Sequence, residues 1–372
     1  MIRRILPLAA VLILASCARP TDRGQQYLDG SFDNVLNPVA SVVTNQPKDF
    51  SLFDAQLAKV EEVSPSLVKK NEAVYDKVQA WLKAGGDPEK LAEFGINTEQ
   101  MGGGDGYGNV LFTGYFSPVI EMRHKPDALF RYPVYGKPIC GERCPTRDEI
   151  YAGALNGLGL ELGYSASLID NFIMEVQGSG FIHFGDTDQL EYFAYGGKNN
   201  HPYVSIGKVL IDQGEIPREK MSLKAIKDWV NSHNEKQVLD LLIQNPSYVF
   251  FLPKAAHPVT GTAGVPLLAG ASVAADREYL PMGTVLLAEV PQLDEMGNWS
   301  GDYVLKLLMA LDTGGAVKKN HLDLYHGMGE EAGIQAGHYK YFGRVWKLGA
   351  EEAPALSPEA PLAKKEDNLA KN

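Results

Sequence analysis

The sequence lacks the short motifs by which most common enzyme classes are recognised. Its 372 residues contain no glycine-rich phosphate loop, no HExxH, no paired CxxC motifs and no GxSxG elbow. These absences exclude most common enzyme classes and leave carboxylates as the side chains able to carry chemistry.

Positive charge is scarce. The chain has 35 Lys and Arg against 46 Asp and Glu, a net charge of −11, and loss of Arg3 and Arg4 with a cleaved N-terminal segment gives −11 − 2 = −13. This balance argues against a nucleic-acid partner. The 45% hydrophobic and 9% aromatic residues suffice for real cores, and 38 Gly with 22 Pro favour turn-rich β structure. The length allows two domains of ordinary size.

Long hydrophobic runs are absent except at the N-terminus. Two positive charges, Arg3 and Arg4, precede an apolar run from Ile5 to Ala15, which is too short to span a bilayer but fits a secretory signal. The run ends at Leu14-Ala15-Ser16-Cys17, which resembles the bacterial lipobox. The resemblance implies a signal peptide over 1–16 and a lipidated Cys17, and Ala18 favours the outer membrane, on its periplasmic side. An ordinary signal peptide is the alternative.

Both ends of the remaining chain have a composition typical of disorder. Residues 17–49 are predicted to tether the lipid to the folded part, and 350–372 to form a disordered tail. The sequence has 3 cysteines. With Cys17 assigned to the lipid, Cys140 and Cys144 are left. In an oxidising compartment this pair favours a small disulfide loop, since a metal site would need further ligands.

Hydrophobic patterning predicts helices over 53–83, 205–213 and 223–242, and strands over 109–117 and 171–184. After residue 254 short strands alternate with tight turns, a spacing typical of a small closed β-barrel. These strands fall in 264–276, 283–291, 302–315, 321–327 and 341–348.

The strongest candidate for chemistry is His321-Leu322-Asp323-Leu324-Tyr325. In a strand, His321, Asp323 and Tyr325 share one face. Burial would raise the pKa of Asp323 and make it a general acid, although the polar face of an ordinary strand fits too. Asp312 enters a glycine turn and is either a turn former or a second carboxylate of the same cleft.

Two glycine-rich segments combine aromatic, hydroxyl and amide groups suited to sugar recognition. One contains Thr113, Gly114 and Tyr115, and the other contains Gln177 and Ser179. Each is equally typical of an ordinary β-turn.

A wider set of segments resembles the membrane-bound lytic murein transglycosylase A family. No single piece is specific, but together they run in the family's order over about Phe112 to Leu348. The segments are LFTGYFSP (111–118), EVQGSG (175–180), SIGKVL (205–210), QNPSYVFF (244–251), ASVAADR (271–277), MALDTGGA (309–316), HLDLYHG (321–327) and YFGRVW (341–346).

The resemblance implies a mainly β fold with a groove for glycan between two domains. A double-psi β-barrel catalytic domain is expected over 50–117 and 254–349, with some N-terminal helix, and an inserted β-rich domain over 118–253. Asp323 would be the catalytic acid and base, and Asp312 would support it. Substrate contacts are expected from Thr113, Gly114, Tyr115, Gln177, Ser179 and Tyr325.

The implied partners are peptidoglycan glycan strands, the membrane through the lipid, and a cell-wall synthesis or hydrolysis complex. The implied reaction cleaves the β-1,4 bond between N-acetylmuramic acid and N-acetylglucosamine and closes a 1,6-anhydro ring. It implies no metal or organic cofactor. A hydrolase with two catalytic carboxylates and a non-catalytic peptidoglycan-binding lipoprotein are the alternatives.

Overall fold

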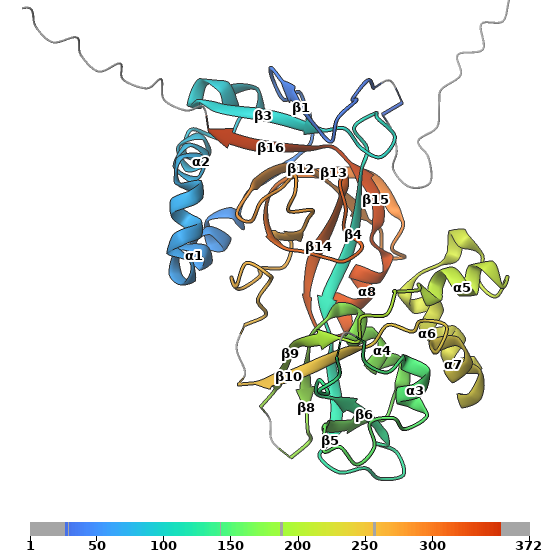
Figure 1. Cartoon of the computed structure of the whole chain (residues 1–372). Coiled ribbons are helices and arrows are strands. Elements are labelled where there is room, and N and C mark those ends of the chain that lie inside the picture. Colours follow the sequence, from blue (N-terminus) through green and yellow to red (C-terminus); the bar gives the residue numbers. More distant parts are fainter. Residues whose placement is uncertain (1–26, 29, 142, 187–188, 256–257, 351–372) are drawn as a thin grey trace, which may run out of the picture.

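The computed structural model describes residues 27–350 apart from 29, 142, 187–188 and 256–257. The predicted signal peptide, Cys17 and residues 351–372 lie outside the described residues. Figure 1 shows two sheets one above the other, with strand β4 (Val110–Ser117) running from the upper toward the lower. None of the helices in the described part is long and apolar enough to cross a membrane.

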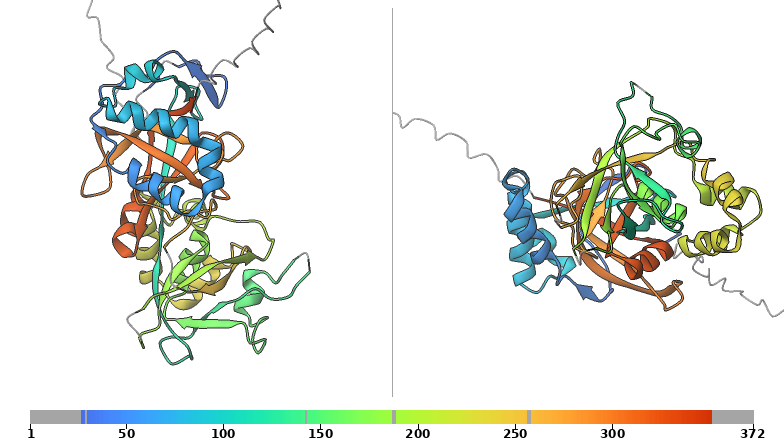
Figure 2. Two further views of the ribbon diagram at one scale, coloured as in Figure 1. Left: turned by 90° about the vertical axis from the view of Figure 1, so that its left-hand side faces the viewer. Right: turned by 90° about the horizontal axis from the view of Figure 1, so that it is seen from below.

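The upper unit begins with helices α1 (Phe53–Val63) and α2 (Pro65–Lys83). The sequence predicted one helix here, but Pro65 lacks a backbone N–H and therefore starts a new helix after Ser64. Val74, Val78 and Trp81 form the buried face of α2. Figure 2 shows both helices lying across one side of the upper sheet. A short 3₁₀ helix, η1 (Pro88–Phe94), follows.

The upper sheet has ten strands in the order β1-β3-β16-β12-β13-β11-β14-β4-β15, with β2 paired to β13. Most of its strands come from the C-terminal third, as the sequence predicted. Besides β4 they are β1 (Leu36–Val39), β2 (Lys48–Asp49), β3 (Ile96–Met101), β11 (Ser272–Ala274), β12 (Val285–Leu293), β13 (Trp299–Asp312), β14 (His321–Met328), β15 (Lys340–Gly343) and β16 (Val345–Ala350).

Both faces of the upper sheet are buried. Along β12, Val285 and Leu287 join a core with the residues of α1 and α2, whereas Leu286 and Ala288 join a second core formed by the strands themselves. Successive side chains of a strand point to opposite faces, so a continuous apolar run serves both cores. The strands curl around the second core in Figure 1.

The lower sheet has six strands in the order β10-β9-β8-β5-β7-β6. They are β5 (Val119–Arg123), β6 (Tyr132–Tyr135), β7 (Glu161–Ser165), β8 (Gly180–His183), β9 (Glu191–Lys198) and β10 (Val249–Lys254). The helices beside it are α3 (Arg147–Tyr151), α4 (Leu168–Gln177), α5 (Ile206–Asp212), η2 (Arg218–Lys220), α6 (Leu223–Ser232) and α7 (Glu235–Leu242). This unit is therefore mixed, although the chain as a whole is mainly β.

In the lower unit one predicted strand was wrong, and one predicted helix is divided into two. The predicted strand over 171–184 is α4 followed by β8, because Ser167 caps α4 and Gly178, with a φ of 82°, ends it. The predicted helix over 223–242 is α6 and α7, because Asn234 begins a second helix with its own capping box.

The predicted tether over 17–49 was too long. β1 pairs with β3, β2 pairs with β13, and Val42 is buried. Backbone pairing of this kind needs no hydrophobic period, so composition alone did not reveal these strands. Helix α8 (Glu330–His338), which packs against β4 and β14, was not predicted either.

Candidate active site

The predicted alternation in the His-x-Asp-x-Tyr segment is present in β14. Leu322 and Leu324 are buried in the second core, the one formed by the strands, at 0% and 4% exposure. Asp323 points to the other face and is only partly buried. β14 pairs in parallel with β4, and Asp323 stands directly opposite Thr113. The pairing therefore places these two side chains on one face.

Asp323 has one hydrogen-bond partner among the described residues, the hydroxyl of Thr113, with 2.6 Å between Oγ1 and Oδ1. The pKa of Asp323 is raised to about 6, because burial and the negative charge of Asp312 raise it by more than the Thr113 hydrogen bond lowers it. Among the residues that the structure describes, no cation counters this shift. Asp323 can thus hold a proton at a pH where an ordinary Asp has lost it.

Asp312 lies close by but has a different environment. Its Oδ1 accepts hydrogen bonds from the backbone N–H and the hydroxyl of Thr262, at 2.8 and 2.6 Å, and from the N–H of Thr313 at 2.8 Å. Its Oδ2 accepts one from the Tyr115 hydroxyl at 3.1 Å. Four donors hold this carboxylate as an acceptor, which leaves little freedom for it to attack a sugar carbon or activate water.

The sheet brings the two acids together through strand β11. Ala274 pairs with Asp312 on one side and with Asp323 on the other, so both acids flank one residue. With strands about 4.8 Å apart, their Cα atoms are roughly 10 Å apart. The loop carrying Thr262 reaches Asp312 because Gly261 has no side chain, and a Cβ there would lie 2.4 Å from the Leu311 carbonyl oxygen.

Tyr115 and Tyr325, both predicted to contact substrate, lie against each other on this face, with ring centroids 5.2 Å apart. Burial and the two Asp charges raise the pKa of Tyr115 well above its usual value, so its phenol remains a donor. Tyr325 is 3% exposed, and its hydroxyl is 3.3 Å from Ser117 Oγ. Its surroundings indicate that Tyr325 supports the site by packing.

Three of the predicted substrate contacts remain: Gly114, Gln177 and Ser179. Gly114 faces α8 on the opposite side of β4 from Asp323, and a Cβ there would lie 2.7 Å from the Ala336 Cα. Gln177, at the end of α4, accepts a hydrogen bond from the Phe116 N–H at 3.2 Å. Ser179 follows it, partly exposed, before β8. Gly114 and Gln177 also line an apolar pocket of about 520 Å³, which lies away from the acids.

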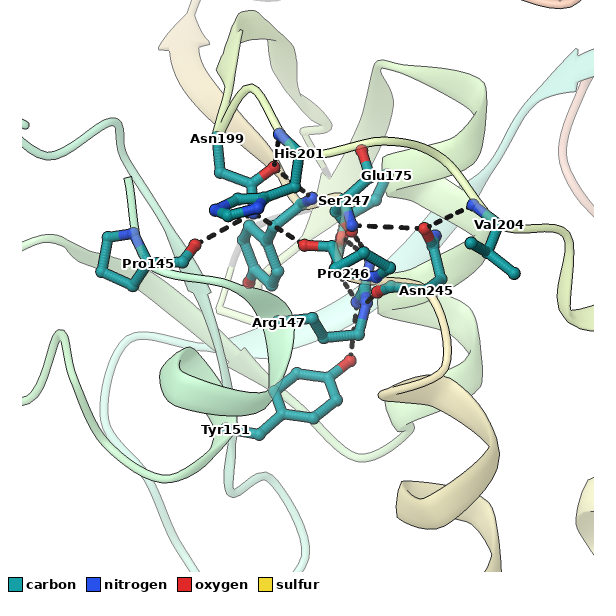
Figure 3. A network of polar contacts seen from close by, with 11 residues as sticks. Pro145, Arg147, Tyr151, Glu175, Asn199, His201, Val204, Asn245, Pro246 and Ser247 are labelled. Atoms are coloured by element: carbon teal, nitrogen blue, oxygen red, sulfur yellow. Dashed lines mark hydrogen bonds and ion pairs between the residues drawn. The ribbon is translucent and has the colours of Figure 1, made fainter. Parts of the chain in front are cut away.

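A second cluster of buried charge lies in the lower unit (Figure 3). Arg147, which is 1% exposed, donates to both carboxylate oxygens of Glu175, at 3.3 and 2.7 Å. Its other N–H groups donate to the carbonyls of Asn245 and Ser247 and to the Tyr151 hydroxyl. Burial alone would lower the pKa of Arg147, but the Glu175 charge raises it overall, so the guanidinium keeps its charge.

The Arg147 cluster ties α3 to α4 and to the segment before β10. Next to it, Cys140 and Cys144 form a disulfide with Cα atoms 5.1 Å apart. Across 27–350, gaps excepted, no group of three His, Cys, Asp or Glu side chains could hold a metal ion.

Sequence reasoning missed Thr262 and Arg147. Thr262 stands in a Gly-Thr turn of ordinary appearance, and its role depends on the distant Asp312. No local sequence pattern pointed to Arg147. Its partners Glu175 and Asn245 do lie in two of the family-like segments, EVQGSG (175–180) and QNPSYVFF (244–251).

Comparisons with known proteins cover nearly the whole chain. The family model described as "MltA specific insert domain" matches residues 141–252, and the one described as "3D domain" matches residues 271–349. The membrane-bound lytic murein transglycosylase A of Vibrio cholerae is 60% identical over 97% of this chain and 98% of its own. The Escherichia coli K12 protein of that name is 50% identical over 93% and 95%.

A solved structure agrees with these matches. The crystal structure of E. coli MltA with bound chitohexaose has a TM-score of 0.85 at 50% identity, covering 90% of this chain and 99% of that one.

Proposed function

Because the chain belongs to the membrane-bound lytic murein transglycosylase A family, we propose that Asp323 is the single catalytic acid and base of a peptidoglycan-cleaving lyase. The chain is a lytic transglycosylase with the two-domain fold of that family. The observation that supports the role of Asp323 is its environment: a carboxyl with a pKa raised to about 6 and, within the described part of the chain, no cationic partner beside it.

The proposed reaction begins with protonated Asp323. Asp323 donates its proton to the glycosidic oxygen between N-acetylmuramic acid and N-acetylglucosamine, and the C1–O bond breaks. The acetamido group of the substrate stabilises the positive charge at C1. The resulting Asp323 carboxylate then takes the proton of the muramic C6 hydroxyl as that oxygen bonds to C1, which closes the 1,6-anhydro ring and restores the acid.

Asp312 supports this cycle without a covalent or proton-transfer step. Its charge raises the pKa of Asp323. Because four donors occupy its oxygens, it is poorly suited to serve as the nucleophile or base that a two-carboxylate hydrolase needs. This arrangement favours the lytic reaction over the hydrolytic alternative. The presence of a poised acid argues against a non-catalytic binding protein.

Glycan strands are the proposed substrate, bound between the two units. Thr113, Tyr115, Gln177 and Ser179 are the proposed contacts, while Gly114 and Tyr325 shape their surroundings. The E. coli relative with bound chitohexaose supports a groove for β-linked amino sugars. The proposed domains are 50–117 with 254–349, a double-psi barrel, and the insert 118–253. The proposed reaction uses no cofactor.

A lipid on Cys17 is proposed to hold the enzyme on the periplasmic side of the outer membrane. The relatives are named membrane-bound, and the lipobox-like Leu14-Ala15-Ser16-Cys17 supports this location. Replacing Cys17 by Ser should leave the protein unlipidated, and detergent partitioning would detect this. A lipid-modified Cys17→Ser protein would exclude the proposal.

Mass spectrometry of digested sacculi tests the reaction, because anhydro products are lighter than hydrolytic ones by one water. Asp323→Asn should fold and bind glycan yet lose at least roughly 10⁴-fold in rate, since Asn neither donates nor accepts the proton. Asp312→Asn should lose less. Near-normal release of anhydro products by folded Asp323→Asn would overturn the role of Asp323. A larger defect in Asp312→Asn would mean that the two roles are exchanged.

A further inference from the structure

The Thr113 hydroxyl lies between two titratable groups. Its Oγ1 is 2.6 Å from Asp323 Oδ1 and 2.8 Å from His321 Nε2. His321 and Asp323 are two residues apart on β14 and share a face, and Thr113 is on the neighbouring strand. A hydroxyl carries one hydrogen, so Thr113 can donate to only one of the two groups at a time.

The other nitrogen of His321 decides which group receives that hydrogen. Nδ1 of His321 is 3.3 Å from the carbonyl oxygen of Ala316. A carbonyl only accepts, so Nδ1 carries the ring proton and Nε2 of the neutral ring has a free lone pair. Nε2 therefore accepts from Thr113, and the Thr113 oxygen in turn accepts from the O–H of a protonated Asp323.

We propose that His321 is a positioning residue that acts through the Thr113 hydroxyl to keep Asp323 in its proton-bearing form, ready to donate to the glycosidic oxygen. This inference rests on the proposed role of Asp323. The alternative arrangement holds the same three protons: Asp323 passes its proton to Thr113, and Thr113 passes its own to Nε2. It pairs an imidazolium with a carboxylate and leaves no proton on Asp323.

The surroundings favour the neutral arrangement. Burial lowers the pKa of His321 and raises that of Asp323, so the shared proton resides on the carboxyl. Asp312 from β13 and Tyr115 from β4 are the other titratable groups facing Asp323: the charge of Asp312 disfavours a negative charge on Asp323, and Tyr115, whose own pKa is raised, stays neutral. Lys340 stands opposite Thr113 on β15, but its ammonium donates to the Met221 carbonyl oxygen.

The chain of hydrogen bonds also accommodates the second half of the reaction. Once Asp323 has given up its proton, the Thr113 hydroxyl can rotate and donate to the carboxylate. When Asp323 regains a proton from the C6 hydroxyl, Thr113 turns back to His321. Loss of the imidazole would remove the acceptor that favours the acid form, and Thr113 would then donate to the Asp323 carboxylate in the resting enzyme as well.

The test measures the pKa of Asp323 directly, by NMR of the full-length protein with ¹³C-labelled Asp carboxyls. The Asp323 signal is the one that Asp323→Asn removes. In His321→Phe, the pKa of Asp323 should fall by roughly one pH unit, the value of one ordinary hydrogen bond. The alkaline limb of kcat/KM should move down equally, with activity falling about tenfold at pH 7.5 but only about twofold at pH 5.

Thr113 supplies the matched controls. Thr113→Ser keeps the hydroxyl and should retain the pKa of Asp323. In a Thr113→Val background, His321→Phe should cause no further change. If thermal melts show that His321→Phe does not fold, His321→Leu carries the same expectation.

An unchanged or raised pKa of Asp323 in folded His321→Phe would overturn the inference. The same fall in the Thr113→Val background would also overturn it, because the effect would then not pass through the hydroxyl. Turnover of sacculi by Asp323→Asn would instead refute the proposed function, so the two failures are distinguishable.

Discussion

Each unit holds a carboxyl group whose pKa is raised by burial, but the partners of the two groups differ. Glu175 in the lower unit meets the guanidinium of Arg147 through both oxygens. The side chain of Asp323 in the upper unit has a hydroxyl as its one hydrogen-bond partner among the described residues, and its pKa is raised to about 6, chiefly by burial. The difference shows that burial alone does not make a carboxyl reactive. A cationic partner turns it into a structural ion pair, and the lack of one leaves it able to hold and release a proton.

The largest effect on stability is expected where a charge loses its partner. Arg147→Met should cost about 3–5 kcal/mol, because Glu175 would remain buried and unpaired. The double variant Arg147→Met with Glu175→Leu should recover most of this loss, since it removes both charges. Urea unfolding measures both free energies. If the single and double variants lose equal free energy of unfolding, the guanidinium stabilises the fold through its hydrogen bonds to the carbonyls of Asn245 and Ser247 and not through Glu175.

Asp323→Asn should make the protein more stable at alkaline pH. A carboxyl whose pKa is raised on folding contributes stability that is present below its unfolded pKa, near 3.9, and is lost as pH rises through its folded pKa. With a folded pKa of about 6, the wild-type protein should lose roughly 2–3 kcal/mol between pH 4 and 7 that the variant keeps. Thermal melts across this range would show it. A constant difference between the two proteins would contradict the raised pKa.

The disulfide beside the Arg147 cluster should matter for stability and not for chemistry. Replacing Cys140 and Cys144 by Ser should cost about 2 kcal/mol, the chain-entropy value for so short a loop. Release of anhydro products should be retained. Denaturant unfolding and the sacculus assay measure the two outcomes, and a loss of turnover in the folded variant would connect the loop to the active site.

The smallest effect is expected at Tyr115. Tyr115→Phe removes one of four donors to Asp312 and should cost about 1 kcal/mol. The three donors from Thr262 and Thr313 remain, so Asp312 should keep its place. A loss as large as that of Arg147→Met would show that Asp312 depends on Tyr115 far more than its contacts indicate.

Local patterns predicted the part of the site that lies within single strands. The alternation of Leu322 and Leu324 with Asp323 placed the acid on the correct kind of face. The parallel pairing of β14 with β4, which sets Thr113 against Asp323, joins residues 210 apart in the sequence. No local pattern encodes such a pairing, and only the family resemblance grouped the two segments.

The errors have two physical origins. The strand predicted over 171–184 was rich in apolar residues because α4 is buried on most sides, and a short apolar run does not distinguish a helix from a strand. The caps at Ser167 and Gly178 were the better signal. β1 and β2 escaped notice because their stability comes from backbone pairing at the sheet, which leaves little trace in composition.

The distance in sequence between Thr113 and Asp323 also sets when the enzyme can become active. The two residues meet only after the whole lower unit has been made and β14 has been added beside β4. Contacts between such distant segments form slowly, because a long loop must close first. A newly made chain therefore has no assembled pair of Thr113 and Asp323 until β14 is in place beside β4, and any cleavage that depends on this pair waits for that step of folding.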